Sequence, residues 1–469
     1  MPQPTIDSGD TAWLLVSAAL VLLMTPGLAF FYGGLVRSKN VLSTIMHSFI
    51  IMGVASLVWV LWGYSLAFGP DKGGFIGDLS WFGMRLVGAE PNADYAATVP
   101  HQAYMLFQMM FAIITPALIT GAFAERARFS TFLVFTVLWM TLVYAPVAHW
   151  VWGKEGWLGT LGGLGAYDFA GGTVVHINSG IAALAAALLF GRRLGYGREP
   201  MEPHNVPFVV LGAGLLWFGW FGFNAGSALA AGGAASNAFL QTNTAAAAGA
   251  VAWMLASWAV IGKPSVVGAA SGAVAGLVAI TPAAGFVGAW EATDGYLNIL
   301  PAIVIGAVAG VLCFGATRLR SRLGFDDALD VWAVHGMGGT WGAIATGIFA
   351  TAAITSVAGF RGGVGGVIDG RPEQLLAQLA GVGATWGYSF VVTFLVLKAL
   401  DLLMGLRVRE EEEVVGVDVS QHGERAYVLE EVGVAAAAYA LRPAPAPAPQ
   451  PAPQPHLAQG ESSAASTSP

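Results

Sequence analysis

Residues 203–262 read PHNVPFVVLGAGLLWFGWFGFNAGSALAAGGAASNAFLQTNTAAAAGAVAWMLASWAVIG and contain no Asp, Glu, Lys or Arg. A helix that crosses a bilayer needs about 20 residues that are almost free of these side chains. The stretch is long enough for two such helices, and Gly232-Gly233 followed by Ser236-Asn237 predicts a turn between them. We therefore expect two consecutive membrane-spanning helices, at residues 206–228 and 239–261.

The rest of the chain has the same composition. Only 10% of its 469 residues are charged, whereas about a quarter are charged in ordinary soluble proteins. So few charges cannot cover the surfaces of the two or three soluble domains that a chain of this length would form. The bilayer is therefore the predicted solvent. The net charge of −7 and the absence of a basic patch in the sequence argue against a nucleic-acid partner.

Charge-free segments recur along the chain, and we interpret each as a transmembrane α-helix. The predicted fold is an all-α polytopic membrane protein with 11 transmembrane helices. The eighth segment is the shortest and is rich in Gly. The approximate bounds are 11–36, 41–68, 101–124, 129–152, 171–190, 206–228, 239–261, 264–280, 297–317, 331–354 and 375–397.

The basic residues of alternate loops predict the orientation. Cytoplasmic loops carry the excess of Lys and Arg in membrane proteins. With the N-terminus outside, the cytoplasmic loops hold eleven such residues and the external loops hold five, so we expect an N-out, C-in topology. The cytoplasmic set is Arg37, Lys39, Arg126, Arg128, Arg192, Arg193, Arg198, Lys263, Arg318, Arg320 and Arg322, and the external set is Lys72, Arg85, Lys154, Arg361 and Arg371.

The composition changes after the last span. Residues 1–404 are the predicted transmembrane domain, and GLRVREEEEVVGVDVSQHGERAYVLEE starts a charged cytoplasmic regulatory tail, 405–441. A docking helix and a solvated tail are both open interpretations of it. Residues 442–469 are rich in Pro and Ala and are predicted to be disordered. The N-terminus, MPQPTIDSGD, lacks the basic region of a signal peptide, so we expect the first span to be retained.

Two histidines lie in corresponding spans. His176 and His335 each begin a His-x-x-x-Gly pattern near the start of spans five and ten, and each follows an Asp, Asp168 and Asp330. Two consecutive halves of five spans each must have opposite orientations in the membrane. Residues 11–190 and 206–354 are therefore predicted to form an inverted repeat, and a final span follows at 375–397. Chance similarity between Gly-rich helices is the alternative.

An ionisable residue at membrane depth indicates function by default. Paired imidazoles can exchange a proton near neutral pH or line a path with hydrogen-bond partners, and a core role or metal binding are the alternatives. A metal site would need a third ligand, and the spans offer none near the two histidines. Cys313 is the single cysteine, so a cysteine-based site is excluded, and no metal or other cofactor is expected. The two Asp residues are predicted to cap the helices that follow them.

Aromatic side chains form a second pattern. Phe107 and Phe111 are one helical turn apart, Trp152 ends span four, and Ser227 follows an aromatic run in span six. Aromatic faces and a hydroxyl can hold a desolvated cation. Packing and an interfacial aromatic belt are the alternative interpretations.

Seven motifs in a fixed order resemble the Amt/MEP/Rh family of ammonium transporters, in particular its bacterial Amt branch. The resemblance runs from about Thr11 to Tyr427; the loop from Lys154 to Tyr167 is longer than usual, and the Pro/Ala-rich tail is additional. The motifs are FYGGLVRSKNVLS (31–43), FQMMFAIITPALITGAFAERARFS (107–130), AHWVWG (148–153), DFAGGTVVHINSG (168–180), PHNVPF (203–208), GWFGFNAGS (219–227) and DVWAVHGMGG (330–339).

The resemblance implies a role for each matching residue. It implies an external ammonium-binding cage, a phenylalanine gate below it, a twin-histidine pore and a buried supporting carboxylate. It also implies a homotrimer in the cell membrane, with one pore per subunit, that binds a PII-type signal protein in the cytoplasm. The cage is Phe107, Phe111, Trp152 and Ser227, the gate is Phe111 and Phe223, the pore pair is His176 and His335, and the supporting carboxylate is Asp168.

The expected function is therefore ammonium transport rather than enzymatic catalysis. Ammonium would bind outside, lose a proton near the cage and cross the apolar pore as ammonia, with or without separate proton transfer. Potassium, which cannot lose its charge, would be excluded. An electroneutral Rh-like channel for ammonia or carbon dioxide and an ammonium sensor are the two alternatives.

Overall fold

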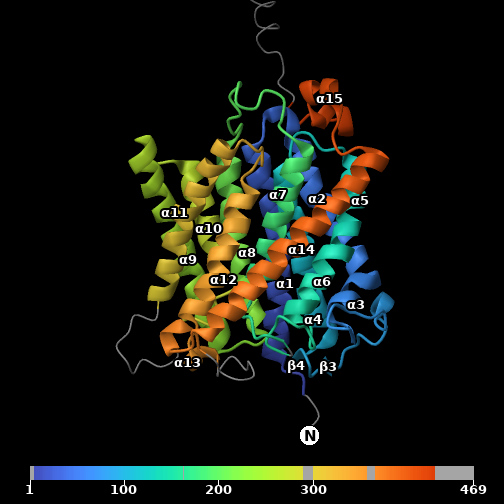
Figure 1. Ribbon diagram of the computed structural model, residues 1–469. Coiled ribbons are helices and arrows are strands. Elements are labelled where there is room, and N and C mark those ends of the chain that lie inside the picture. Colours follow the sequence, from blue (N-terminus) through green and yellow to red (C-terminus); the bar gives the residue numbers. More distant parts are fainter. Residues whose placement is uncertain (1–4, 162, 289–298, 356–364, 428–469) are drawn as a thin grey trace, which may run out of the picture. The chain divides into compact units, whose positions relative to one another are not determined.

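The computed structural model describes residues 5–161, 163–288, 299–355 and 365–427, and long helices dominate these parts of the chain (Figure 1). The first half contains α1 (Ser8–Leu35), α2 (Val41–Val58), η2 (Trp59–Gly63), α3 (Tyr64–Phe68), α4 (His101–Ile119), η4 (Thr120–Phe123), α5 (Phe129–Trp139), η5 (Met140–Tyr144), α6 (Ala145–Trp152), η6 (Gly172–Ile177) and α7 (Asn178–Phe190). The second half contains α8 (Val206–Ala225), η7 (Gly226–Ala228), α9 (Gly233–Ile261), α10 (Val266–Ile280), α11 (Leu300–Leu323), η9 (Trp332–Met337), α12 (Gly338–Phe349), α13 (Ala352–Thr355) and α14 (Glu373–Met404).

The prediction of an all-helical, multi-pass membrane fold is confirmed. Within the described ranges, nine helical segments are long and apolar enough to cross a bilayer, and they coincide with nine of the eleven predicted spans. The predicted eighth span is α10, an apolar helix of 15 residues, and the predicted tenth span is divided between η9 and α12. The total of eleven spans stays a prediction.

Three helices extend beyond their predicted bounds. α9 begins at Gly233 rather than near residue 239, so the turn predicted at Ser236-Asn237 is wrong and both residues are helical. α11 ends at Leu323 rather than near residue 317, and its last turn carries Arg320 and Arg322. α14 continues through Lys398 to Met404. The charge pattern indicates where a helix leaves the hydrocarbon, whereas the helix itself can continue into the polar region beyond it.

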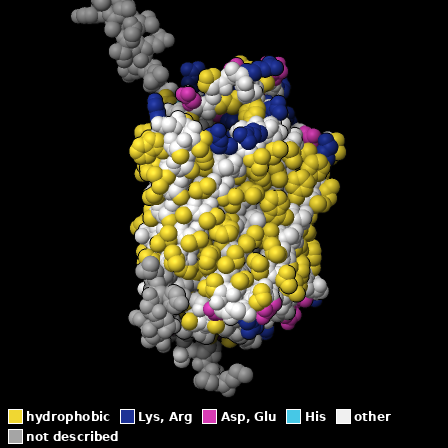
Figure 2. All heavy atoms as spheres, turned by 60° about the vertical axis from the view of Figure 1, so that its left-hand side comes forward, with side chains coloured by type: hydrophobic (Ala, Val, Ile, Leu, Met, Phe, Trp, Pro, Cys, Tyr) yellow, Lys and Arg dark blue, Asp and Glu magenta, His cyan; other side chains and the backbone are white. Residues whose placement is uncertain are grey.

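Side chains on the surface are sorted along the helix axes. Figure 2 shows hydrophobic side chains over the middle of the visible face, with Lys, Arg, Asp and Glu at its two ends. Large apolar side chains such as Phe218, Trp258 and Leu395 are more than half exposed in the single chain. This distribution suits contact with lipid or with other membrane-embedded chains.

The two ends of the bundle differ in structure. At one end, short strands form two antiparallel hairpins, β1 (Asp71–Lys72) with β2 (Ile76–Gly77) and β3 (Pro91–Asn92) with β4 (Ala96–Pro100). The start of α1 lies at this hairpin end, since the Asp7 amide donates to the Thr98 carbonyl at 2.8 Å. The opposite end carries α15 (Glu410–Val415), so we name the two ends the hairpin end and the α15 end (Figure 1).

The segment after α14 packs against the bundle. The Asp418 carboxylate accepts hydrogen bonds from the backbone amides of Leu42 (3.0 Å) and Ser43 (2.8 Å) at the start of α2. Burial raises the pKa of Asp418, against the opposing effect of these amides. Residues up to Ala426 belong to one compact unit with the helices, which favours the docking interpretation for this part of the tail. The rest of the predicted tail, 428–441, and the Pro/Ala-rich residues 442–469 lie outside the described residues.

The two histidine-bearing segments run in opposite directions. Arg193 follows α7 and Asp326 precedes η9, and their side chains pair at 2.9 Å at the α15 end. The segment η6–α7 therefore ends where the segment η9–α12 begins. This arrangement is what an inverted repeat requires.

Candidate functional site

His176 and His335 meet in the interior of the bundle. Their Nδ1 atoms lie 3.2 Å apart, and both rings are almost fully buried. Each histidine lies on a π-helical turn, His176 on η6 and His335 on η9. π-turns are rare and occur frequently at functional sites. The sequence placed the two histidines in matching spans, and the structure brings their rings into contact.

A glycine permits this close approach. Gly180 lies one turn after His176, and a Cβ atom built on it would lie 2.1 Å from the Gly336 amide nitrogen. No side chain fits at that distance without moving the backbone. The Gly of the first His-x-x-x-Gly pattern therefore lets the segment that carries His335 pack directly against the backbone.

Asp168 caps the helix that carries His176. Its carboxylate accepts hydrogen bonds from four successive backbone amides, those of Gly171, Gly172, Thr173 and Val174, at 2.7–3.1 Å. These are the amides that the first turn of a helix leaves without a partner, and a negative charge is favourable there. The predicted capping role of Asp168 is confirmed.

Asp330 does not cap the second histidine helix, and that prediction was wrong. Asp330 has a positive φ of 59° and pairs with Arg320 at 2.7 Å. Asp327 caps this helix instead, because its Oδ2 accepts a hydrogen bond from the Trp332 backbone amide at 2.7 Å. Asp327 precedes His335 by eight residues, the same spacing that separates Asp168 from His176. Pairing each histidine with the nearest preceding Asp therefore selected Asp330 and missed Asp327.

Two cavities contain the predicted site residues, and the inner one reaches the histidines. The hairpin-end cavity, of about 440 Å³, is lined by Phe107, Phe111, Trp152, Asp168 and Ser227 among others. The inner cavity, of about 340 Å³, is lined by Phe223, Trp220, His176 and His335, and it continues to Arg193 and Tyr196 towards the α15 end. Each predicted site residue therefore lines one of these two cavities.

Phe111 and Phe223 lie between these cavities. Their ring centroids are 4.5 Å apart, and both side chains are buried. Phe111 lines the hairpin-end cavity, whereas Phe223 lines the inner one and also stacks on His176 at 5.8 Å. The two rings therefore meet where one cavity lining gives way to the other.

The four predicted cage residues come from three separate parts of the chain. Phe111 makes edge contacts with Phe107 at 4.9 Å and with Trp152 at 5.8 Å. Trp152 is fixed by a hydrogen bond from its Nε1 to the Asp168 carbonyl at 3.0 Å. Ser227 donates its hydroxyl proton to the Phe223 carbonyl at 2.9 Å, which leaves its oxygen lone pairs available to a ligand.

The structure adds residues that the sequence did not single out for the site. The Trp220 ring stacks on His176 at 5.3 Å, and its Nε1 donates to Thr281 at 2.9 Å. Gln108 lines the hairpin-end cavity and has a buried amide oxygen without a hydrogen-bond partner. Trp220 belongs to the aromatic run of span six, and Gln108 is an amide between Phe107 and Phe111 in an otherwise apolar stretch, FQMMF.

The other histidines near the spans have structural surroundings. His149 lies between the Asp71 carboxylate at 2.9 Å and the Ala67 carbonyl at 3.0 Å, and His101 contacts the Tyr64 hydroxyl at 2.6 Å. His47 packs against Phe132, with ring centroids 4.4 Å apart. Among the residues that the structure describes, no group of three or more His, Cys, Asp or Glu is placed to hold a metal ion.

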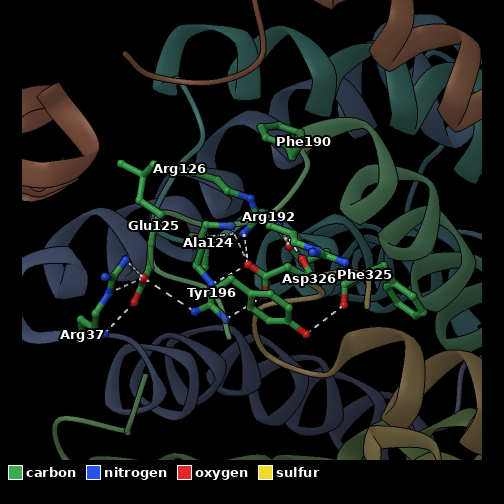
Figure 3. A network of polar contacts seen from close by, with 12 residues as sticks. Arg37, Ala124, Glu125, Arg126, Phe190, Arg192, Tyr196, Phe325 and Asp326 are labelled. Atoms are coloured by element: carbon green, nitrogen blue, oxygen red, sulfur yellow. Dashed lines mark hydrogen bonds and ion pairs between the residues drawn. The ribbon is translucent and has the colours of Figure 1, made fainter. Parts of the chain in front are cut away.

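A buried network of charges closes the α15 end of the bundle (Figure 3). Glu125 pairs with Arg37 at 2.6 Å and faces Arg193 at 3.7 Å, and Arg193 pairs with Asp326. Burial alone would raise the pKa of Glu125, but the charge of Arg193 and the hydrogen bonds from Arg37 hold it below its usual value. Ion pairs thus join the loops that follow α1, α4, α7 and α11.

The fold and the site together define a polytopic membrane transporter with two interior cavities and a pair of contacting aromatic rings between their linings. The particular family is then clear, because the chain matches the model of the Ammonium Transporter Family over residues 12–427 and belongs to that family. It is an ammonium transporter, and the members of this family are transporters and channels rather than enzymes.

Relatives match the chain over nearly their whole length. The ammonium transporter of Bacillus subtilis is 51% identical, covering 90% of this chain and 99% of the relative. The ammonium transporter Amt1 of Archaeoglobus fulgidus is 47% identical, with 90% and 100% covered. The crystal structure of Candida albicans Mep2 is 40% identical with a TM-score of 0.81, and the match covers 90% of this chain and 91% of that one.

Proposed function

We propose that the protein binds the ammonium cation in the hairpin-end cavity, where the cation passes one proton to water, and that ammonia then crosses past His176 and His335 while the proton crosses separately. The contact between the two Nδ1 atoms at 3.2 Å carries this proposal. Two neutral imidazoles in an aromatic route offer hydrogen-bond partners to a neutral molecule, but they offer no counter-charge to a cation.

The cage residues have the chemistry to recruit the cation. The aromatic rings of Phe107, Phe111 and Trp152 attract a cation through their faces, and Ser227 adds an oxygen acceptor. Asp168 supports the cage indirectly, because its carbonyl fixes Trp152 and its carboxylate caps η6. Phe111 and Phe223 act as a gate that opens for the solute.

Selectivity against potassium follows from the loss of the proton. Potassium and ammonium have similar sizes and equal charges, so a cage of aromatic rings distinguishes them poorly. Moving an unpaired ion into an apolar interior costs many kcal/mol, whereas ammonium can shed its charge and cross as a neutral molecule. The apolar interior therefore selects ammonium over potassium, because only ammonium can cross it in a neutral form.

Reconstitution into liposomes tests the proposal. Jumps in ammonium concentration are expected to produce transport, recorded as membrane current and as a change in lumen pH, and potassium jumps are expected to produce none. Variants Asp168→Ala and His176→Ala/His335→Ala should lose ammonium transport or potassium exclusion, and full retention of both would contradict the assignment. Ammonia flux without current would favour the Rh-like gas channel, and binding without flux would favour the sensor.

We infer that the hairpin end faces outward and the α15 end faces the cytoplasm of the cell. The concentration of Arg residues at the α15 end supports this orientation. We also infer a homotrimer in the cell membrane and a cytoplasmic PII-type partner. Native mass spectrometry in detergent tests the trimer, and a pull-down with the full chain and with a chain truncated after Gly405 tests the partner.

A further inference from the structure

One face of α4 forms a wall of the hairpin-end cavity. Tyr104, Phe107, Gln108 and Phe111 all line this cavity. Their positions i, i+3, i+4 and i+7 place them on a single helical face, so the aromatic residues already assigned to the cage have Gln108 between them. Gln108 is the member of this face whose side chain carries an amide.

The hydrogen bonds of Gln108 leave one polar atom unused. The side chain is 8% exposed, and its Nε2 donates to the Tyr104 hydroxyl at 3.2 Å. Its Oε1 is buried and has no hydrogen-bond partner in the described part of the chain. A buried carbonyl oxygen without a partner costs about 1–3 kcal/mol, so native proteins rarely retain one without a reason.

The cavity around Gln108 suits a donor-rich cation. Ammonium carries four N–H donors in a tetrahedral arrangement, and aromatic faces can satisfy only part of them. The Ser227 hydroxyl already donates its hydrogen bond to the Phe223 carbonyl, so it can act only as an acceptor towards a ligand. A second neutral acceptor in the same cavity would take another N–H of the cation.

We propose that Gln108 is a further substrate-binding residue, whose Oε1 accepts a hydrogen bond from ammonium in the hairpin-end cavity. The inference rests on the proposed ammonium binding in that cavity and adds a directional contact to it. Aromatic faces attract any small cation, whereas an amide oxygen in the same cavity adds a directional hydrogen bond to a cation that carries N–H donors. Gln108 therefore contributes to ammonium recognition more than to the rate of conduction.

The test compares two isosteric changes with a matched control on the same helix. Gln108→Met keeps the length of the side chain and removes the acceptor, and Gln108→Glu replaces the amide by a carboxylate. Gln102→Leu is the control, because Gln102 is exposed on α4 and does not line the cavity. Each variant is reconstituted into liposomes, and transport is measured against ammonium concentration at fixed pH, with and without potassium.

Gln108→Met is expected to raise the half-saturating ammonium concentration about tenfold at an unchanged maximal rate, because one charge-assisted hydrogen bond is lost. Gln108→Glu is expected to lower that concentration and to make potassium a competitive inhibitor. Gln102→Leu should match the wild type. An unchanged half-saturating concentration, or a lower maximal rate alone, in Gln108→Met would overturn the inference. If that variant does not fold, an unchanged response of Gln108→Glu to ammonium and potassium has the same consequence.

The failure of this inference differs from the failure of the proposed function. If the wild type shows no saturable response to ammonium, the proposed function fails, and Gln108 has no ligand to bind. If the wild type saturates with ammonium and both Gln108 variants behave identically to it, the proposed function stands and Gln108 is only a packing residue.

Discussion

The Nδ1 atoms of His176 and His335 lie 3.2 Å apart, although 159 positions separate the two residues in the chain. At this distance one Nδ1 donates a hydrogen bond and the other accepts it, so two neutral rings hold complementary tautomers. Two protonated rings would direct N–H groups at each other. The contact therefore excludes two charged rings, and two neutral rings with complementary tautomers suit a route for a neutral solute.

The first prediction concerns this contact. Replacing either histidine by Ala leaves the other ring without its partner, so His176→Ala and His335→Ala should each lower ammonium transport by at least tenfold. The double variant should lose little more than a single one, because both changes remove the same interaction. Liposome transport assays measure all three variants, and fully additive losses would indicate that the two rings act independently.

The second prediction concerns the packing of the two histidine segments. A methyl group at position 180 would collide with the Gly336 backbone, so Gly180→Ala should lower the stability by about 1–3 kcal/mol and disturb transport. Gly383 on α14 is the control, because a Cβ there meets no atom within 4 Å. Thermal unfolding in detergent should show a lower midpoint for Gly180→Ala and no decrease for Gly383→Ala. Equal midpoints for the two variants would contradict the tight packing.

The third prediction concerns the pH dependence of stability at the α15 end. Burial, with a further contribution from the charge of Asp330, raises the pKa of Asp327 to about 6. Since the folded state binds this proton more tightly than the unfolded state, the contribution of Asp327 to stability is fully present below pH 4 and is lost as the pH rises through about 6.

The variant Asp327→Asn removes this titration. The unfolding midpoint of the wild type, relative to that of Asp327→Asn, should therefore rise as the pH is lowered from 7 to 5. Circular dichroism in detergent across this range measures the difference. A difference that does not change with pH would show that Asp327 does not titrate there.

The fourth prediction concerns the ion pairs of Figure 3. Glu125 is buried between Arg37 and Arg193, so Glu125→Gln removes the ion-pair partner of Arg37 and one of the two partners of Arg193, and it should cost about 3 kcal/mol at pH 7. Glu373→Gln breaks the exposed pair with Arg371 and should leave the unfolding midpoint unchanged.

The same pair has a predictable response to acid. Because the pKa of Glu125 is lowered in the folded state, its contribution is fully present above the ordinary glutamate value of about 4.3 and is lost as the pH falls through the folded value. The midpoints of wild type and Glu125→Gln should therefore converge on acidification. A constant separation between them would count against an ionised Glu125.

The long-range pattern of the sequence predicted the fold class because the bilayer imposes a strict chemical rule on it. Charge-free segments such as 11–36 and 206–228 coincide with α1 and α8 within a few residues. The rule also located α10 and the segment η9–α12, but it did not predict that α10 has only 15 residues or that a π-turn begins the tenth segment. Motif order in turn predicted the ammonium transporter family.

The sequence by itself determined the membrane environment, the family and the candidate residues, because composition and motif order are properties of a linear chain. The tertiary structure decided which of these residues touch. In the structure His176 contacts His335, Asp327 rather than Asp330 caps the second histidine helix, and Gln108 lines the same cavity as the aromatic cage. These contacts join helices that lie far apart along the chain, and their geometry depends on close packing and π-turns that no local spacing specifies.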